Sequence, residues 1–75
     1  MTPQQSRMAR ASLKWTIDDL AAAAGVGRAT VARFEGGQSV MVDTIATLRS
    51  AFDAKCVKFV DDGPMAGAVY GIKAG

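Results

Sequence analysis

The sequence contains no histidine and only one cysteine, Cys56, among its 75 residues. A single cysteine cannot form a disulfide within the chain, and the lack of histidine excludes zinc sites of the usual Cys/His type and histidine-based catalytic triads. Asp18 and Asp19 are adjacent, so on a helix their carboxylates would diverge by about 100° and would not act as a catalytic pair. We therefore expect no enzyme activity, no metal and no cofactor, and Cys56 is expected to be a small hydrophobic residue on a strand.

Long hydrophobic runs are absent as well. No apolar segment approaches the ~18–20 residues that span a bilayer, and the polar first ten residues lack the apolar core of a secretory signal. We expect a cytoplasmic protein without a membrane partner. Apolar residues make up 49% and charged residues 21% of the chain, which is typical of a globular protein. Its length suits one small domain of marginal stability, which dimerisation would help.

The net charge of +2 is small, but it is unevenly distributed. Residues 1–37 carry five positive and three negative side chains, whereas residues 38–75 carry four of each. The whole excess therefore lies in the first half, where an electrostatic surface for a partner is expected.

Capping signals and apolar spacing predict a mainly α fold, in which four helices are followed by a short β-hairpin. Thr2 before Pro3 fits the start of a helix, and Thr16 with Asp19 has the pattern of a capping box. Gly25 stands where a left-handed residue would end the second helix. The expected elements are helices 3–13, 17–24, 28–35 and 41–54, strands 56–60 and 68–72, and a turn at 61–64.

Met8, Ala11 and Ser12 recur at helical spacing and support the first helix. Some packing residues are also predicted, and in the fourth helix the apolar stripe is Ile45, Leu48, Ala51 and Phe52. The methionines Met8, Met41 and Met65 are expected to pack in the interior, as is Trp15 at the corner between the first two helices.

The second and third helices, joined by a glycine turn, are typical of a helix-turn-helix motif over residues 17–36. Ala21 lies where the two helices would cross most closely, because a larger side chain would push them apart. The side chains expected to pack between them are Leu20, Ala24, Val26, Val31 and Phe34. An αα-hairpin of an unrelated helical bundle would give the same pattern, so that alternative stays open here.

Four segments of the chain resemble the Xre family of phage-repressor-type helix-turn-helix proteins. They are Arg7-x-x-Arg10-Ala11, Trp15-Thr16-Ile17-Asp18-Asp19-Leu20-Ala21, Ala24-Gly25-Val26 and Thr30-Val31-x-x-Phe34-Glu35-x-Gly37. The resemblance covers residues 4–54, and the strands that follow are similar to a compact single-domain subgroup. It implies one DNA-binding domain over residues 1–75 that binds an operator as a homodimer and regulates transcription. It also implies that Arg10 pairs with Glu35.

The third helix is the expected recognition helix. The residues Arg28, Ala29, Ala32 and Arg33 lie within about 140° on one face, opposite Val31 and Phe34. Arginine can bond bidentately to guanine, and an alanine methyl can contact the methyl of thymine. Thr30, Thr16 and the amides at the start of the Ile17 helix are expected phosphate contacts. At Ile17 many family members carry a glutamine that contacts DNA near the backbone, so that contact is in doubt here.

Two questions remain open at the level of sequence. Arg28 and Arg33 could merely be solvated, and Arg7 and Lys14 are expected to face solvent more often than phosphate. The competing function is a protein-docking module, such as an antitoxin or anti-activator, which the low net charge and the missing glutamine favour.

The expected function is that of a sequence-specific double-stranded DNA-binding regulator, acting as a repressor, with no small-molecule ligand. The two strands, with Phe52 and Tyr70, are expected to form the dimer interface, because an isolated two-stranded hairpin is marginal in water.

Overall fold

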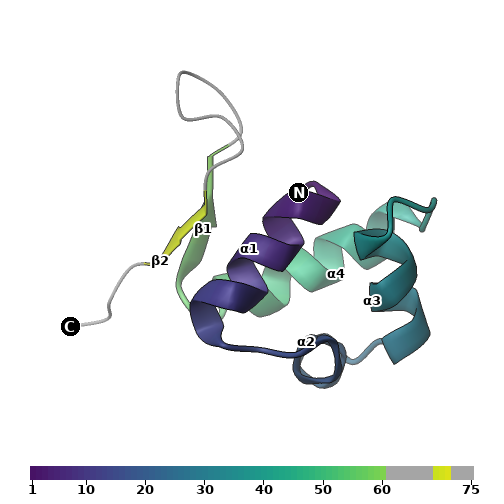
Figure 1. The fold of residues 1–75 in the computed structure, drawn as a ribbon, viewed down its shortest axis with the longest axis horizontal. Helices are drawn as coiled ribbons and strands as arrows, with labels where there is room; N and C mark the ends of the chain where they lie inside the picture. The colour runs from purple at the N-terminus through teal and green to yellow at the C-terminus, as the bar shows by residue number, and fades with distance from the viewer. Residues whose placement is uncertain (61–68, 72–75) are drawn as a thin grey trace.

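The computed structural model describes residues 1–60 and 69–71, which form four helices and two short strands (Figure 1). The elements are α1 (Pro3–Leu13), α2 (Ile17–Ala24), α3 (Arg28–Glu35), α4 (Val42–Asp53), β1 (Val57–Phe59) and β2 (Val69–Gly71). The first three helices have the predicted bounds, and the fourth is one residue shorter at each end. The mainly α fold with four helices is therefore as predicted. None of the helices described here is long and apolar enough to cross a bilayer.

Local capping explains why the helices start where they do. The Thr2 side chain accepts a hydrogen bond from the Gln5 amide at 3.1 Å, and the Gln5 side chain accepts one from the Thr2 amide at 2.9 Å. Thr16 and Asp19 make the same reciprocal pair at the start of α2, with the same two distances. Each capping box satisfies amides that a helix start leaves without partners.

The core lies between α2, α3 and α4, with α1 packed across α3. Its fully buried side chains include Leu20, Val31, Leu48 and Phe52. Trp15 is half-buried and stacks on Phe52, with ring centroids 5.9 Å apart. The apolar stripe predicted for α4 therefore faces this core.

The two strands are antiparallel, with Val57 opposite Gly71 and Phe59 opposite Val69. β1 lies against α4 and β2 against α1, so the pair covers one end of the helices (Figure 1). Val57 is buried, and Phe59 meets Phe52 edge to face at 5.8 Å. The predicted turn at 61–64 lies outside the described residues.

Two packing predictions are wrong. Met8 and Met41 face solvent, with 40% and 71% of their surface exposed, and Met65 lies outside the described residues. The buried face of α1 consists of Gln5, Ser6 and Ala9. Its polar groups are satisfied there, because Ser6 donates to Glu35 on α3 and the Gln5 side chain bonds to the Thr2 amide and the Val60 carbonyl. Ala11 and Ser12 are exposed.

Two predictions at the end of the chain also fail. Cys56 does not belong to a strand: it has a left-handed backbone with φ of 62°, and β1 begins after it. Phe52 is fully buried in the core of its own chain, so it cannot form a dimer interface. The side chain of Tyr70 is outside the described part of the structure.

Candidate nucleic-acid interface

Three residues, Gly25 to Gly27, join α2 to α3. Gly25 has φ of 70°, and the Val26 amide donates to the Ala21 carbonyl at 3.1 Å, so the chain reverses immediately after α2. A residue with a Cβ is strained in this left-handed conformation, whereas glycine is not. Gly27 is the N-cap of α3 and offers no capping side chain, so Arg28 is the first helical residue.

Helix α3 has one buried face and one exposed face. Val31, Phe34 and Glu35 are buried, and Thr30 is half-buried at the edge. The four residues predicted to face DNA, which are Arg28, Ala29, Ala32 and Arg33, are all exposed. The side of α3 that solvent reaches thus carries two guanidinium groups and two methyl groups.

Arg28 is not a free cation. Its Nε lies 2.7 Å from Oδ1 of Asp18 in the first turn of α2, with 68% of the Arg28 side chain and 69% of the Asp18 side chain exposed. This contact was not predicted from the sequence. The signal available for it was the acidic first turn of α2, which lies next to the positive first residue of α3.

Arg33 has no hydrogen-bond or ion-pair partner among the residues that the structure describes. It borders an open hollow where α3 meets the start of α4. The other residues that line this hollow are Thr30, Ser39, Val40, Met41 and Thr44. Met41 and Val42 stand beside it with 71% and 79% of their surface exposed. Sequence reasoning missed this part of the surface, because the loop that forms it has no regular pattern.

The start of α2 has limited capacity to bind phosphate. The Thr16 amide donates to the Asp19 carboxylate, and the Thr16 hydroxyl oxygen accepts from the Asp19 amide. What remains for an anion among the described residues is the hydroxyl proton of Thr16 and the Ile17 and Asp18 amides, for which no acceptor is found, and the nearby carboxylates of Asp18 and Asp19 oppose an anion there. Ile17 is half-buried and packs against the core rather than standing free in solvent.

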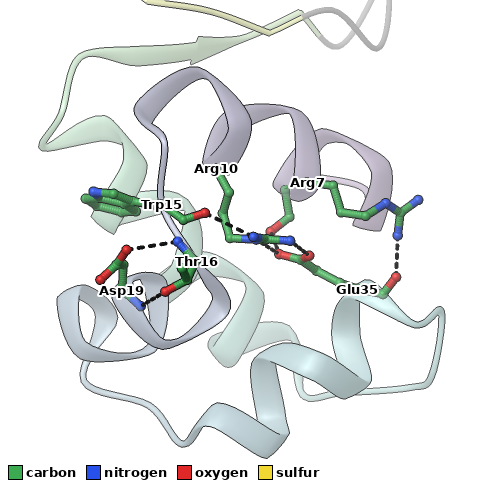
Figure 2. A network of polar contacts seen from close by, with 7 residues as sticks. Arg7, Arg10, Trp15, Thr16, Asp19 and Glu35 are labelled. Atoms are coloured by element: carbon green, nitrogen blue, oxygen red, sulfur yellow. Dashed lines mark hydrogen bonds and ion pairs between the residues drawn. The ribbon is translucent and has the colours of Figure 1, made fainter.

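A buried polar network fixes the other end of α3 (Figure 2). Oε1 of Glu35 accepts from Nη2 of Arg10 at 2.7 Å, and Oε2 accepts from Nε of Arg10 at 2.8 Å and from the Ser6 hydroxyl at 2.7 Å. Arg10 also donates to the Trp15 carbonyl, and Arg7 donates to the backbone carbonyl of Glu35. Within the described residues no buried side-chain nitrogen or oxygen lacks a partner.

The network links α1 to the last turn of α3 and so holds the exposed face of α3 in one orientation. The hydrogen bond to Glu35 raises the pKa of the Arg10 guanidinium above its ordinary value, although burial opposes the shift. Arg10 therefore stays charged. Arg7, which was expected to face solvent, is exposed but engaged at the end of α3.

Comparison with models of protein families matches residues 7–58 to HTH_3, a helix-turn-helix family. The match runs from within α1 into β1 and includes all of α2 and α3. It describes a DNA-binding family of the Xre type, whose members are not enzymes. No curated protein matches the chain.

Proposed function

The chain belongs to the helix-turn-helix family of the Xre type, and from this premise we propose that it is a sequence-specific repressor that binds its operator as a homodimer. In this proposal residues 1–75 form a single DNA-binding domain. The observation that carries it is the exposed face of α3, where two arginines and two alanines stand opposite the buried Val31 and Phe34.

Each side chain on that face has a role that follows from its chemistry. A major groove admits a helix, where an arginine can donate two parallel hydrogen bonds to guanine. Arg28 at the start of α3 takes this role, and the methyls of Ala29 and Ala32 contact thymine methyls. Thr30 and the Thr16 hydroxyl donate to phosphates on either side. Arg33, which has no partner within residues 1–60 and 69–71, adds a positive charge near the α4 end of the same face.

The homodimer is proposed because two copies would place two α3 helices on half-sites about 34 Å apart, one turn of DNA. The β1–β2 pair is the proposed contact between the copies. It consists of two three-residue strands at one end of the helices, and such a pair gains stability when another element packs on it. Lys58 and Phe59 are half-buried, so they remain candidates for this contact, unlike Phe52. Sedimentation that finds only monomer at high micromolar concentration would reject the dimer.

The proposal is tested by fluorescence anisotropy with a labelled duplex from the region upstream of the chain's own gene. We expect binding that resists scrambled competitor duplex and weakens steeply with salt, because each neutralised phosphate adds about −0.9 to the slope of log K against log salt. The stoichiometry of the complex reports the dimer. Binding that scrambled duplex abolishes would contradict a sequence-specific role.

A protein-docking module is the second candidate. The observation that favours it is the exposure of Met41 and Val42 beside the open hollow, together with the neutralisation of Arg28 by Asp18. An apolar interface of this kind should be almost insensitive to salt. If the duplex does not bind at low or at moderate salt, a pull-down with the wild-type chain would test this second function. Met41→Asp is the control variant, because it places a charge in the apolar surface and should lose the partner.

A further inference from the structure

The ion pair between Asp18 and Arg28 brings the carboxylate to Nε of an arginine whose side chain is 68% exposed, and no other partner of Arg28 is found among the described residues. We infer that Asp18 is a positioning residue, which holds Arg28 by its Nε edge so that its two Nη groups can read a guanine. This inference rests on the proposed function, because it assigns a role within the same DNA-binding face.

The geometry of the guanidinium supports the assignment. Arginine has five N–H donors, one on Nε and two on each Nη. Oδ1 of Asp18 lies 2.7 Å from Nε, on one edge of the guanidinium. Guanine presents O6 and N7 side by side in the major groove, and two parallel N–H groups match them. One arginine can therefore be held by a carboxylate along one edge and bind a base along another.

The positions of Asp18 and Arg28 allow the ion pair to restrict the conformations of the arginine. Asp18 has a short side chain in the first turn of α2, and Arg28 is the first residue of α3. The turn at Gly25 reverses the chain after the eight residues of α2, and this arrangement brings the two side chains within 2.7 Å of each other. An exposed arginine without a partner samples many rotamers and must lose that freedom when it binds a base. Pairing with Asp18 restricts those rotamers before DNA arrives.

The charge of Asp18 leads to a second prediction, which concerns affinity for unrelated duplex and can be measured separately from base discrimination. Asp18 neutralises Arg28, so this arginine attracts phosphate less than Arg33 does, and its contribution should be to base choice. Removing the carboxylate then has two opposite effects. Discrimination at one guanine falls because Arg28 loses its support, whereas affinity for unrelated duplex stays level or rises because a negative charge has gone.

The test compares Asp18→Asn with the wild-type chain, using duplexes with a randomised central segment as the probe. Wild type selects its preferred duplex, and the ratio of Kd values is then measured for each guanine replaced by adenine. Arg28→Ala identifies the guanine that Arg28 reads. Asp53→Asn is the matched control, since it removes the carboxylate of another exposed pair, with Lys58 at 3.7 Å. Thermal unfolding of every variant checks that the fold is kept.

We expect wild type to discriminate at that guanine by about 5- to 150-fold, the range of a bidentate pair, and Arg28→Ala to abolish this preference. Asp18→Asn should reduce the preference by about two- to fivefold, the scale of an exposed ion pair. Asp53→Asn should leave it unchanged. Adding Asp18→Asn to Arg28→Ala should change the preference at that guanine no further, because the carboxylate acts on base choice through the arginine.

Three other outcomes would each reject a different part of this scheme: the role of Asp18, the role of Arg28, or sequence-specific binding itself. If Asp18→Asn strengthens binding to every duplex equally and keeps the guanine preference, Asp18 merely repels phosphate and the inference is wrong. If Arg28→Ala leaves all preferences intact, Arg28 does not read a base, the inference falls and DNA binding stands. If wild type selects no sequence, the sequence-specific function itself is rejected.

Discussion

Arg10 and Glu35 form a two-point ion pair that joins the first helix to the last turn of α3 (Figure 2). The two bonds measure 2.7 and 2.8 Å, and the side chains are 18% and 5% exposed. The two residues lie 25 positions apart in the chain. The pair therefore ties the orientation of α3 to a contact far from its exposed face, and a change in the pair should alter how that exposed face is held.

Breaking this pair on either side should destabilise the fold, and removal of the arginine should cost more. Glu35→Gln is expected to lower the free energy of unfolding by about 2–4 kcal/mol, since Arg10 keeps some access to water. Arg10→Met leaves the more deeply buried carboxylate without its cation, so its loss should be larger. Urea unfolding of both variants and of the double variant measures the two losses and their coupling. Losses that simply add would show that the pair contributes nothing as a pair.

The Ser6 hydroxyl should stabilise the fold through its hydrogen bond in the network, apart from any effect of serine on helix propensity. Its side chain is fully buried and donates to Glu35 at 2.7 Å. Ser6→Ala should cost about 1.5–3 kcal/mol, the value of a hydrogen bond to a charged acceptor. The matched control is Ser12→Ala on the same helix, where the serine is exposed and bonds only to the Ala9 carbonyl. Equal unfolding midpoints for the two variants would contradict a role for the buried hydroxyl.

The helix bounds were predictable from the sequence because their determinants are local. The capping contacts of Thr2, Thr16 and Gly25 reach no further than four residues along the chain. These signals can therefore be recognised in the sequence when the tertiary contacts are not known. The exposed face of α3 follows in the same way from its period. The family match supports the same motif, over residues 7–58.

The contacts that complete the candidate site were less predictable, because they join distant segments. Burial of Ser6 depends on Glu35, which is 29 residues away, so its hydroxyl gives no sign of burial in the spacing of α1. The pair between Asp18 and Arg28 depends on how α2 and α3 meet. Met41 is apolar and yet exposed, because it lies at the N-cap position, where the loop enters α4, and not on the face of α4 that packs against the core.

The turn between α2 and α3 should depend on the backbone of Gly25 and not on free space around it. A Cβ at Gly25 would meet nothing within 4 Å, but φ of 70° strains any residue that has one. Gly25→Ala should therefore destabilise the fold by about 1 kcal/mol, and Gly25→Asn by less, because asparagine tolerates this region. Thermal unfolding gives the comparison.

Gly27→Ser is the control for that turn. Gly27 has φ of −71°, and a Cβ there lies no closer than 3.8 Å to Thr30. Serine suits an N-cap, so this variant should be neutral or slightly more stable. If both glycine substitutions cost the same, the left-handed conformation would not be the cause of the loss at Gly25.

The start of α4 is a place where the natural sequence can be improved. Met41 is the N-cap of α4, makes no side-chain capping bond and is 71% exposed. Met41→Ser should stabilise the chain by about 1 kcal/mol, because serine accepts from an amide of the first turn. The melting temperature should then rise by about 4–8 °C for a domain of this size. Met41→Ala supplies the control, since it removes the same exposed side chain without adding a cap.

Arg33 should contribute to DNA affinity through charge, because it has no partner among the described residues and stands on the exposed side of α3. Arg33→Ala should weaken binding to preferred and unrelated duplexes by similar factors. It should also reduce the slope of log K against log salt by about 0.9, the share of one phosphate. Anisotropy titrations at three or more salt concentrations give that slope.

Lys55→Ala is the matched control for Arg33→Ala, because it removes an equal charge at the other end of α4. That helix has 12 residues, and at 1.5 Å per residue the two ends are about 18 Å apart. A DNA-binding surface confined to the α3 side predicts that Lys55→Ala keeps the full salt slope. If both variants lower the slope of log K against log salt by the same amount, duplex binding depends on net charge alone. The exposed face of α3 would then not be the DNA-binding surface.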